Sequence, residues 1–276
     1  MMRSLWTAAS GMRAQQVNVD TIANNVANIN TIGYKTQQAS FKSLLYQNLQ
    51  STSTNNAGEN KPVAAEVGLG SRVAAITGTF TQGNLTHVEN PFSVALEGDG
   101  FFQIRTESGE LQYTRDGSFE ISPVTNGNML CTSDGNPVLD AYGNEIILPS
   151  NRVATDLVVN QDGTLAFPDG TGNPAVITDT NGRPVKFGIY QFNNPAGLSK
   201  EGGNNYSVTA ASGAAVAENG NATVKQTKTH QYYTEASNVD VANEMVNLIV
   251  AQRAYEMNSK AIQASDEMMQ QANNLR

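Results

Sequence analysis

Near the N-terminus, apolar residues recur at intervals of seven, and a second series follows the first by three positions. The first series is Leu5, Met12, Val19 and Val26, and the second is Ala8, Gln15, Ile22 and Ile29. This spacing predicts a helix with a coiled-coil type of seam. Ser4 can cap its start, and Gly33 can end it in a left-handed conformation. Gly11 within it costs about 1 kcal/mol relative to alanine, so this helix is not built for stability in isolation.

The C-terminal region repeats this pattern. Its strict seven-residue series is Val241, Leu248, Tyr255, Ile262 and Met269, and its alternate positions are Met245, Gln252, Ser259 and Asp266. Asn238 or Asp240 can cap the helix. One such helix is equally typical of an amphipathic helix packed on its own domain. Two heptad helices at opposite ends of the chain favour pairing as a coiled coil.

Between the two ends the hydrophobic period changes from seven to two. Short alternating runs are separated by turn-forming pairs, at Asp116-Gly117, Asp134-Gly135, Asp162-Gly163 and Asn181-Gly182. Both central residues of a type I′ turn need positive φ, so these pairs predict β-hairpins. The middle of the chain is therefore expected to be an all-β module.

These patterns predict an α+β protein in which paired N- and C-terminal heptad helices enclose a mainly antiparallel all-β domain. We expect residues 1–36 and 237–276 to form the helical domain and residues 73–236 the β-rich domain, with 37–72 as an extended connecting segment. Within that segment, residues 47–66 have few large apolar side chains and many turn formers. Taken alone, this stretch is typical of a flexible linker.

Composition narrows the possible partners. The 276 residues include 17 Lys and Arg against 25 Asp and Glu, a formal charge of −8, which disfavours nucleic-acid and anionic-membrane binding. No stretch is apolar enough to insert into a membrane. The first residues, MMRSLWTAASGMRAQQ, lack the continuous apolar core of a cleavable signal peptide.

Candidate chemistry is sparse. His87 and His230 are the only histidines, and each lies in a polar context that predicts a structural or surface role. Paired glycines such as Gly98 and Gly100 do not continue into a phosphate-binding motif. The Asp-rich loops lack the EF-hand order and are explained by turn chemistry. Cys131, the single cysteine, is predicted to be a small buried hydrophobe. We therefore expect no enzyme activity, cofactor or metal site.

The stretch ANNVANINTIGYKT, residues 23–36, is unusually rich in asparagine for a helix that only stabilises its own chain. Asparagine competes with the helical backbone for hydrogen bonds. Together with LWTAASGMRAQQ before it, this stretch resembles the N-terminal signature of the axial proteins of the bacterial flagellum, the rod, hook and hook-associated subunits. The C-terminal stretch EASNVDVANEMVNLIVAQRAYEMNSKAIQASDEMM resembles the matching rod and hook signature, and EGDGFFQI and YTRDGSFEI are similar to the β domain of the same family.

The resemblance implies a structural subunit that assembles helically into a hollow, rigid drive shaft carrying torque from motor to hook. The chain has room for one β domain and carries the 47–66 segment, and both features favour the distal rod over a proximal rod or hook subunit. In the distal rod an insertion at this place is understood to pack between subunits and stiffen the tube. On this reading, residues 47–66 would be ordered on assembly.

The resemblance also implies location and partners. The protein would lie in the basal body of the flagellum, in the rod that spans the periplasm, exported by the flagellar type III apparatus without a cleaved signal peptide. Its partners would be further copies of itself, proximal rod proteins, the hook protein and the surrounding P- and L-ring proteins.

In such polymers the terminal helices pair and touch helices of neighbouring copies. The self-assembly seam would then comprise Leu5, Met12, Val19, Ile22, Val26, Ile29, Val241, Met245, Leu248, Tyr255, Ile262 and Met269. Asn24, Asn25 and Asn28, with Gly33 in the same motif, are candidates for contacts between subunits. Burying this seam alone is not expected to offset the ordering of two backbone segments, so we expect the ends to be disordered in the free monomer.

A different class of protein is also compatible with the Asn-, Thr- and Gly-rich strands. A secreted β-rich adhesin or carbohydrate-active enzyme would share them, but it would need neither heptad end.

Overall fold

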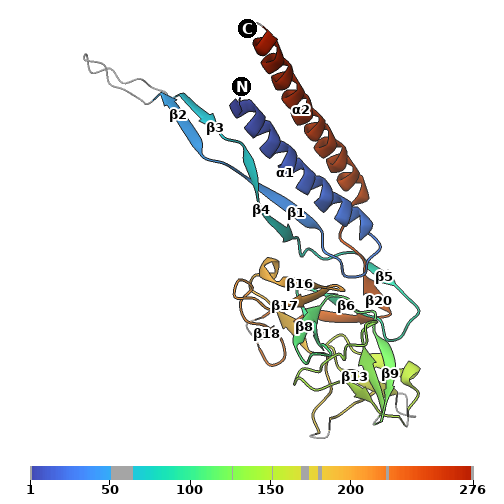
Figure 1. Ribbon diagram of the computed structural model, residues 1–276. Coiled ribbons are helices and arrows are strands. Elements are labelled where there is room, and N and C mark those ends of the chain that lie inside the picture. Colours follow the sequence, from blue (N-terminus) through green and yellow to red (C-terminus); the bar gives the residue numbers. More distant parts are fainter. Residues whose placement is uncertain are drawn as a thin grey trace. The chain divides into compact units, whose positions relative to one another are not determined.

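The computed structural model describes residues 2–50, 65–125, 127–150, 152–168, 174–179, 182–221 and 224–274 (Figure 1). The chain folds into two compact units. The helical unit comprises residues 1–27, 37–78 and 240–276, and the β-rich unit comprises 28–36 and 79–239. The protein is α+β, as predicted, with one long helix at each end of the chain.

The helical unit contains two helices and a two-stranded ribbon. Helices α1 (Met2–Ala27) and α2 (Val241–Asn274) lie side by side (Figure 1). In the ribbon, β1 (Gln37–Ser43) pairs antiparallel with β4 (Ser71–Gly78), and β2 (Tyr46–Gln50) pairs with β3 (Ala65–Gly68). Helix α1 also packs against β1 and β4. A two-stranded ribbon is marginally stable in water on its own, so its contact with α1 supports both elements.

Both ends of the chain are helical within a single molecule, which differs from the expectation that only a polymer would order them. That expectation counted the pairing of the two helices alone. It left out the ribbon, which adds a second packing surface for α1. It also left out the hydrogen bonds that join α1 to the ribbon, as between Ser71 N–H and Ser10 Oγ at 3.3 Å.

The observed helix ends correct part of the sequence prediction. Helix α1 begins at Met2, so Ser4 lies inside it and is not its N-cap. It ends at Ala27, and Ile29 and Gly33 therefore lie beyond it. Gly33 is left-handed as predicted, with φ of 70°, but it lies in a turn beyond the helix end.

The start of α2 is capped by Asp240, one of the two predicted residues. Its Oδ1 accepts a hydrogen bond from the backbone N–H of Ala242 at 3.0 Å, which satisfies one of the free donors of the first turn. Asn238, the other predicted cap, belongs to the β-rich unit and has other partners there.

The strands of the β-rich unit pair antiparallel throughout the described residues. The largest sheet has the order β16-β17-β8-β7-β15-β18, formed by Ser199–Gly202, Asn205–Ser207, Leu111–Thr114, Phe101–Arg105, Ile189–Gln191 and Val216–Ala217. Two three-stranded sheets are β11-β10-β9 (Ile147–Leu148, Gly127–Cys131, Glu120–Val124) and β12-β13-β14 (Val158–Val159, Leu165–Pro168, Pro174–Val176). The remaining pairs are β19-β6 (Lys228–Gln231, Val94–Glu97) and β20-β5 (Tyr233–Glu235, Leu85–His87).

Strand β7 supplies side chains to two separate cores. Its neighbours Phe101 and Phe102 point to opposite faces of the sheet, because side chains alternate along a strand. Phe102 packs edge-on against Phe119 in the larger core, with ring centroids 5.0 Å apart, and Phe101 packs against Phe192 in the smaller one. Cys131 is buried on β10, as predicted, and burial raises the pKa of its thiol.

The predicted turns have mixed outcomes. Asp162-Gly163 forms the hairpin between β12 and β13, and the chain also reverses at Asp134-Gly135, where Gly135 N–H bonds Thr132 O at 2.8 Å. Asp116-Gly117 is not a hairpin, because β8 and β9 belong to different sheets. Asp116 instead accepts bonds from the N–H and hydroxyl of Ser118. Asn181 lies outside the described residues.

The grouping of the segments differs from the expected bounds. Residues 28–36 belong with the β-rich unit, and residues 37–78 with the helical unit. The ends of the 47–66 stretch are strands, in β2 and β3, so the prediction of a flexible linker is wrong there. Residues 51–64 lie outside the described part of the chain.

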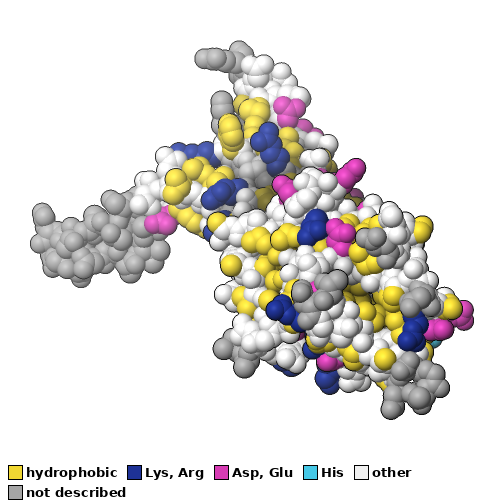
Figure 2. Space-filling view, turned by 90° about the horizontal axis from the view of Figure 1, so that it is seen from below, with side chains coloured by type: hydrophobic (Ala, Val, Ile, Leu, Met, Phe, Trp, Pro, Cys, Tyr) yellow, Lys and Arg dark blue, Asp and Glu magenta, His cyan; other side chains and the backbone are white. Residues whose placement is uncertain are grey.

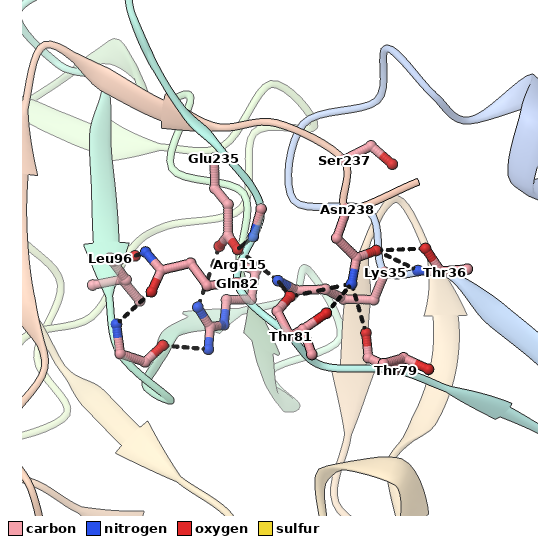
Figure 3. A network of polar contacts seen from close by, with 12 residues as sticks. Lys35, Thr36, Thr79, Thr81, Gln82, Leu96, Arg115, Glu235, Ser237 and Asn238 are labelled. Atoms are coloured by element: carbon pink, nitrogen blue, oxygen red, sulfur yellow. Dashed lines mark hydrogen bonds and ion pairs between the residues drawn. The ribbon is translucent and has the colours of Figure 1, made fainter. Parts of the chain in front are cut away.

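A polar network, buried around Glu235, joins four segments of the β-rich unit that are far apart in sequence (Figure 3). Glu235 bonds Lys35 Nζ at 2.5 Å, Arg115 Nη1 at 3.2 Å and the backbone N–H of Gly83 at 2.8 Å. Asn238 accepts bonds from the N–H and hydroxyl of Thr36 and donates to the carbonyl oxygens of Thr79 and Thr81.

The network places one carboxylate against two buried cations. The side chains of Lys35, Arg115 and Glu235 are each at most 1% exposed. Burial, and next the charge of Arg115, lower the pKa of Lys35, while Glu235 opposes this shift. Arg115 also lies over the ring of Phe101 at 5.1 Å. Glu235 is therefore the shared partner that makes both cations tolerable in the interior.

We expect Glu235→Gln to destabilise the β-rich unit by about 3–5 kcal/mol, because it leaves two buried cations without a counter-charge. Lys35→Met should cost less, since Glu235 keeps its bonds to Arg115 and Gly83. Urea unfolding, with hydrogen exchange across residues 79–239, measures both losses. Equal losses in the two variants would contradict the shared role of Glu235.

Candidate functional site

The two terminal helices meet in one antiparallel register. Ser4 Oγ lies 3.4 Å from Ser265 Oγ, and Asn25 Nδ2 lies 3.3 Å from Glu244 Oε1. Between these pairs, Gly11 lies against the side chain of Asn258. From Ser4 to Gly11 and on to Asn25, α1 advances by seven and then fourteen residues. Their partners on α2 go back by the same numbers of residues, from Ser265 to Asn258 and on to Glu244. These contacts between the two helices are therefore spaced by seven or fourteen residues.

The row of α2 that faces α1 consists of small and polar residues. Glu244, Ala251 and Ser265 are the buried residues of this helix, and Asn258 continues their spacing. This row follows the predicted Val241 series by three positions. The predicted alternate series, which begins at Met245, lies one position further along the helix than this row. Met245 is instead exposed.

The other predicted seam residues occupy the flanks of this contact or the surface. Ile22 is buried, as is Ala8 in the same series. The half-buried members are Leu5, Met12, Val19, Val26, Ile29, Leu248, Ile262 and Met269. Val241 and Tyr255 are exposed. The large apolar residues of the predicted seam are therefore only partly used within one chain.

Gly11 has a packing reason that the sequence did not reveal. A Cβ at this position would lie 2.9 Å from Nδ2 of Asn258 and 3.2 Å from its Cγ. Glycine thus lets the Asn258 side chain approach the backbone of α1. The low helix propensity of Gly11 is linked to close pairing with α2.

Asn25 joins α1 to two other elements of the helical unit. Its Nδ2 donates to the carbonyl oxygen of Gln37 at 2.8 Å, and its Oδ1 accepts from the N–H of the same residue at 2.9 Å. Nδ2 also donates to Glu244 on α2. Only 1% of Asn25 is exposed. An amide both donates and accepts, so it can satisfy the first residue of β1 and the carboxylate together.

The remaining motif residues have different surroundings. Asn24 is exposed, while Asn28 is half-buried and its Oδ1 accepts a bond from Thr31 Oγ1 at 3.1 Å. Gly33 is buried in the β-rich unit, where its N–H bonds Glu235 O at 2.8 Å. A Cβ on Gly33 would lie 2.9 Å from Asp116 N. The motif thus combines residues with separate structural roles.

Glu244 is a buried residue of the contact between α1 and α2 that the sequence patterns did not predict. Burial is the largest influence on its carboxyl group and raises its pKa, and the bond from Asn25 opposes this shift. The signal was present in the sequence, since Glu244, Ala251, Asn258 and Ser265 recur at intervals of seven. A search for apolar residues alone could not find this row.

Large apolar side chains remain exposed on the helical unit. On α2 they are Val241, Met245, Val246, Ile249, Val250, Tyr255, Met257 and Met268, and on α1 Trp6 is 75% exposed. Figure 2 shows yellow hydrophobic side chains beside dark-blue Lys and Arg side chains at the surface. Contiguous exposed apolar surface marks interaction sites in proteins. The helical unit is thus the candidate site for contact with other chains.

Neither metal chemistry nor a membrane span finds support in the described residues. Across these ranges, no cluster of three or more His, Cys, Asp or Glu side chains could bind a metal ion. None of the helices in the described part of the chain is long and apolar enough to span a bilayer. His230, predicted to be structural or at the surface, pairs with Glu97 at 2.7 Å.

We expect Asn25→Ala to weaken the helical unit by about 1–3 kcal/mol, because Gln37 and Glu244 lose a buried partner. Far-UV circular dichroism of the full chain and hydrogen exchange at the Gln37 amide measure this loss. Gln16→Ala, at an exposed position of the same helix, is the matched control and should change neither signal. Equal effects of the two substitutions would contradict the role of Asn25.

Glu244 predicts a pH dependence of the same unit. Its raised pKa means that the folded state holds the proton more tightly than the unfolded state, whose pKa is near 4.5. The contribution of Glu244 to stability is therefore present below that value and is lost as pH rises through the raised pKa. Glu244→Gln should remove this loss, keep an acceptor for Asn25 and increase the helical signal at neutral pH. A constant difference between variant and wild type across this pH range would contradict the prediction.

The known proteins that are similar to this chain belong to the flagellum. Residues 5–35 match the model of the flagella basal body rod protein, 95–167 that of the flagellar hook protein FlgE/F/G D1 domain, and 230–275 that of the flagellar basal body rod FlgEFG protein C-terminal domain. The chain is 43% identical to the flagellar basal-body rod protein FlgG of Borreliella burgdorferi, covering 100% of this chain and 99% of the relative.

Two further relatives carry the same name. FlgG of Caulobacter vibrioides is 38% identical and FlgG of Bacillus subtilis 34%, each over 100% of both chains. The domain models are shared by FlgE, FlgF and FlgG, whereas these full-length relatives distinguish between them. The chain belongs to the FlgG family of flagellar basal-body rod proteins.

Proposed function

We propose that this chain is the structural subunit of the distal rod and that it assembles helically into a hollow, rigid shaft. Its membership of the FlgG family makes it a structural protein of the flagellar basal body and not an enzyme. The observation that carries the assembly proposal is the apolar surface left open on α2, a helix of 34 residues with three buried ones. Neighbouring copies would bury this surface.

In the assembled shaft, we propose that α1 and α2 pair as a coiled coil and that each pair touches helices of adjacent copies. The partly exposed members of the predicted seam, such as Leu248, Ile262 and Met269, would complete their burial there. Asn24 and Asn28 would contact neighbours, whereas Asn25 already bonds Gln37 and Glu244 within its own chain. An amide at a subunit boundary can fix register by donating and accepting together.

The 47–66 segment would stiffen the shaft by packing between copies. Its described ends are paired strands on which Tyr46 and Leu49 are exposed. Burial of these side chains against a neighbour would favour a straight tube. The proposed external partners are the proximal rod proteins, the hook protein, the P- and L-ring proteins and the flagellar type III export apparatus.

Rival functions have less support. The domain models alone would also suit a proximal rod or hook subunit, but the full-length relatives named FlgG favour the distal rod. A secreted adhesin or carbohydrate-active enzyme would not explain relatives that match across both helical ends.

We expect the purified full-length chain to form straight tubes visible by electron microscopy. A chain lacking residues 2–27 and 241–274 should remain monomeric, because it has lost both helices. Curved tubes from the full-length chain would favour a hook subunit instead. Tube formation by the trimmed chain, or its absence in the full-length chain, would overturn the proposal.

A further inference from the structure

The chain passes from the β-rich unit into the helical unit between Thr36 and Gln37. Each unit binds its own side of this junction through an asparagine side chain. In the β-rich unit, Oδ1 of Asn238 accepts bonds from the N–H and the hydroxyl of Thr36, both at 2.7 Å (Figure 3). In the helical unit, Oδ1 of Asn25 accepts from the N–H of Gln37 at 2.9 Å, and its Nδ2 donates to the Gln37 carbonyl oxygen at 2.8 Å. Two amide side chains therefore hold two consecutive residues.

Three consecutive peptide groups are hydrogen-bonded at this junction. The first, between Lys35 and Thr36, is bonded through the Thr36 N–H. The second joins the two units, and its carbonyl oxygen accepts from the N–H of Thr79 at 2.8 Å while its N–H donates to Asn25. The third is bonded through the carbonyl oxygen of Gln37. Because each peptide group is planar, holding three in a row fixes both backbone dihedrals of Thr36 and of Gln37.

A second junction, between Gly78 and Thr79, is held beside the first. On the helical side of the boundary, Gly78 pairs with Gln37 in the ribbon. On the other side, Thr79 bonds Thr36, and the carbonyl oxygen of Thr79 accepts from Nδ2 of Asn238 at 2.9 Å. Backbone pairing thus continues across the boundary without interruption, so neither junction can bend without the other.

We propose that Asn25 and Asn238 form a clamp that makes the 36–37 junction a fixed joint and not a hinge. Hinges are positions that absorb large changes in φ and ψ, and here these dihedrals are held from both sides. The two asparagines act together, because a junction peptide released on one side is less well placed for its bond on the other. A fixed joint would suit the proposed rigid shaft, but it is a property of the single chain and can be tested without assembly.

The test is hydrogen exchange at the junction amides of the full chain. Asn238→Ala should lower the protection of the Gln37 N–H about tenfold or more, although Asn238 makes no bond to that group. Conversely, Asn25→Ala should lower the protection of the Thr36 N–H by about the same factor. Two side chains that act independently would each affect only the amide that loses its own bond, and that result would overturn the clamp.

Thr36→Val is a milder variant for the case that Asn238→Ala unfolds the β-rich unit. It removes the hydroxyl bond to Asn238 and keeps the bond from the backbone N–H. The protection of the Gln37 N–H should fall about threefold, as expected for the loss of one weak bond. Unchanged protection of Gln37 in a folded Thr36→Val chain would contradict the proposal.

Gln231→Ala is the matched control. Gln231 is a half-buried amide of the β-rich unit whose side chain also bonds backbone groups, those of Val159, Pro91 and Leu157. The variant should destabilise the β-rich unit and keep the protection of the Gln37 N–H within about twofold of wild type. An effect on Gln37 equal to that of Asn238→Ala would show a general loss of stability and would overturn the fixed joint.

Discussion

Three polar side chains, Asn25, Glu235 and Asn238, hold together parts of the chain that are far apart in sequence. Asn25 and Glu235 are buried, and Asn238 is half-buried. A buried polar group without a partner costs about 1–3 kcal/mol, so Asn25 and Glu235 strongly favour the one arrangement that satisfies them. Asn25 bonds Gln37 and Glu244 in the helical unit. In the β-rich unit, Glu235 and Asn238 bond residues 35 and 36 (Figure 3). The N-terminal and C-terminal parts of the chain are thus joined within each unit by specific bonds rather than by apolar packing alone.

The use of polar residues between the two helices affects the outer surface of α2. Because small and polar residues such as Gly11, Ala251 and Ser265 occupy the contact between α1 and α2, most large apolar residues of α2 are displaced to its outer sides. A chain that used Met257 or Val250 for its own core would have little apolar surface left for neighbours. The division suits the proposed assembly, in which neighbouring copies would bury this apolar surface.

Sequence periodicity predicted the helices and strands more accurately than it predicted which residues contact one another. The seven-residue repeat was sufficient for both terminal helices, and turn pairs such as Asp162-Gly163 were sufficient for antiparallel strands. The row of α2 that faces α1 was not predicted, because it contains Glu244 and Asn258. A search for apolar residues assigns such polar residues to the solvent-exposed side of a helix. The network of Lys35, Arg115 and Glu235 could not be predicted because its members are up to 200 residues apart. Such partners are decided by tertiary folding, which no local pattern records.

The route of the backbone has a mechanical consequence. The chain passes between the helical unit and the β-rich unit four times, at residues 27–28, 36–37, 78–79 and 239–240. Any force that one unit exerts on the other is therefore divided among four covalent connections in parallel, and no single peptide linkage carries all of it. A nick by a protease in one of these stretches would leave three intact, so a damaged subunit in a rotating shaft would stay in one piece.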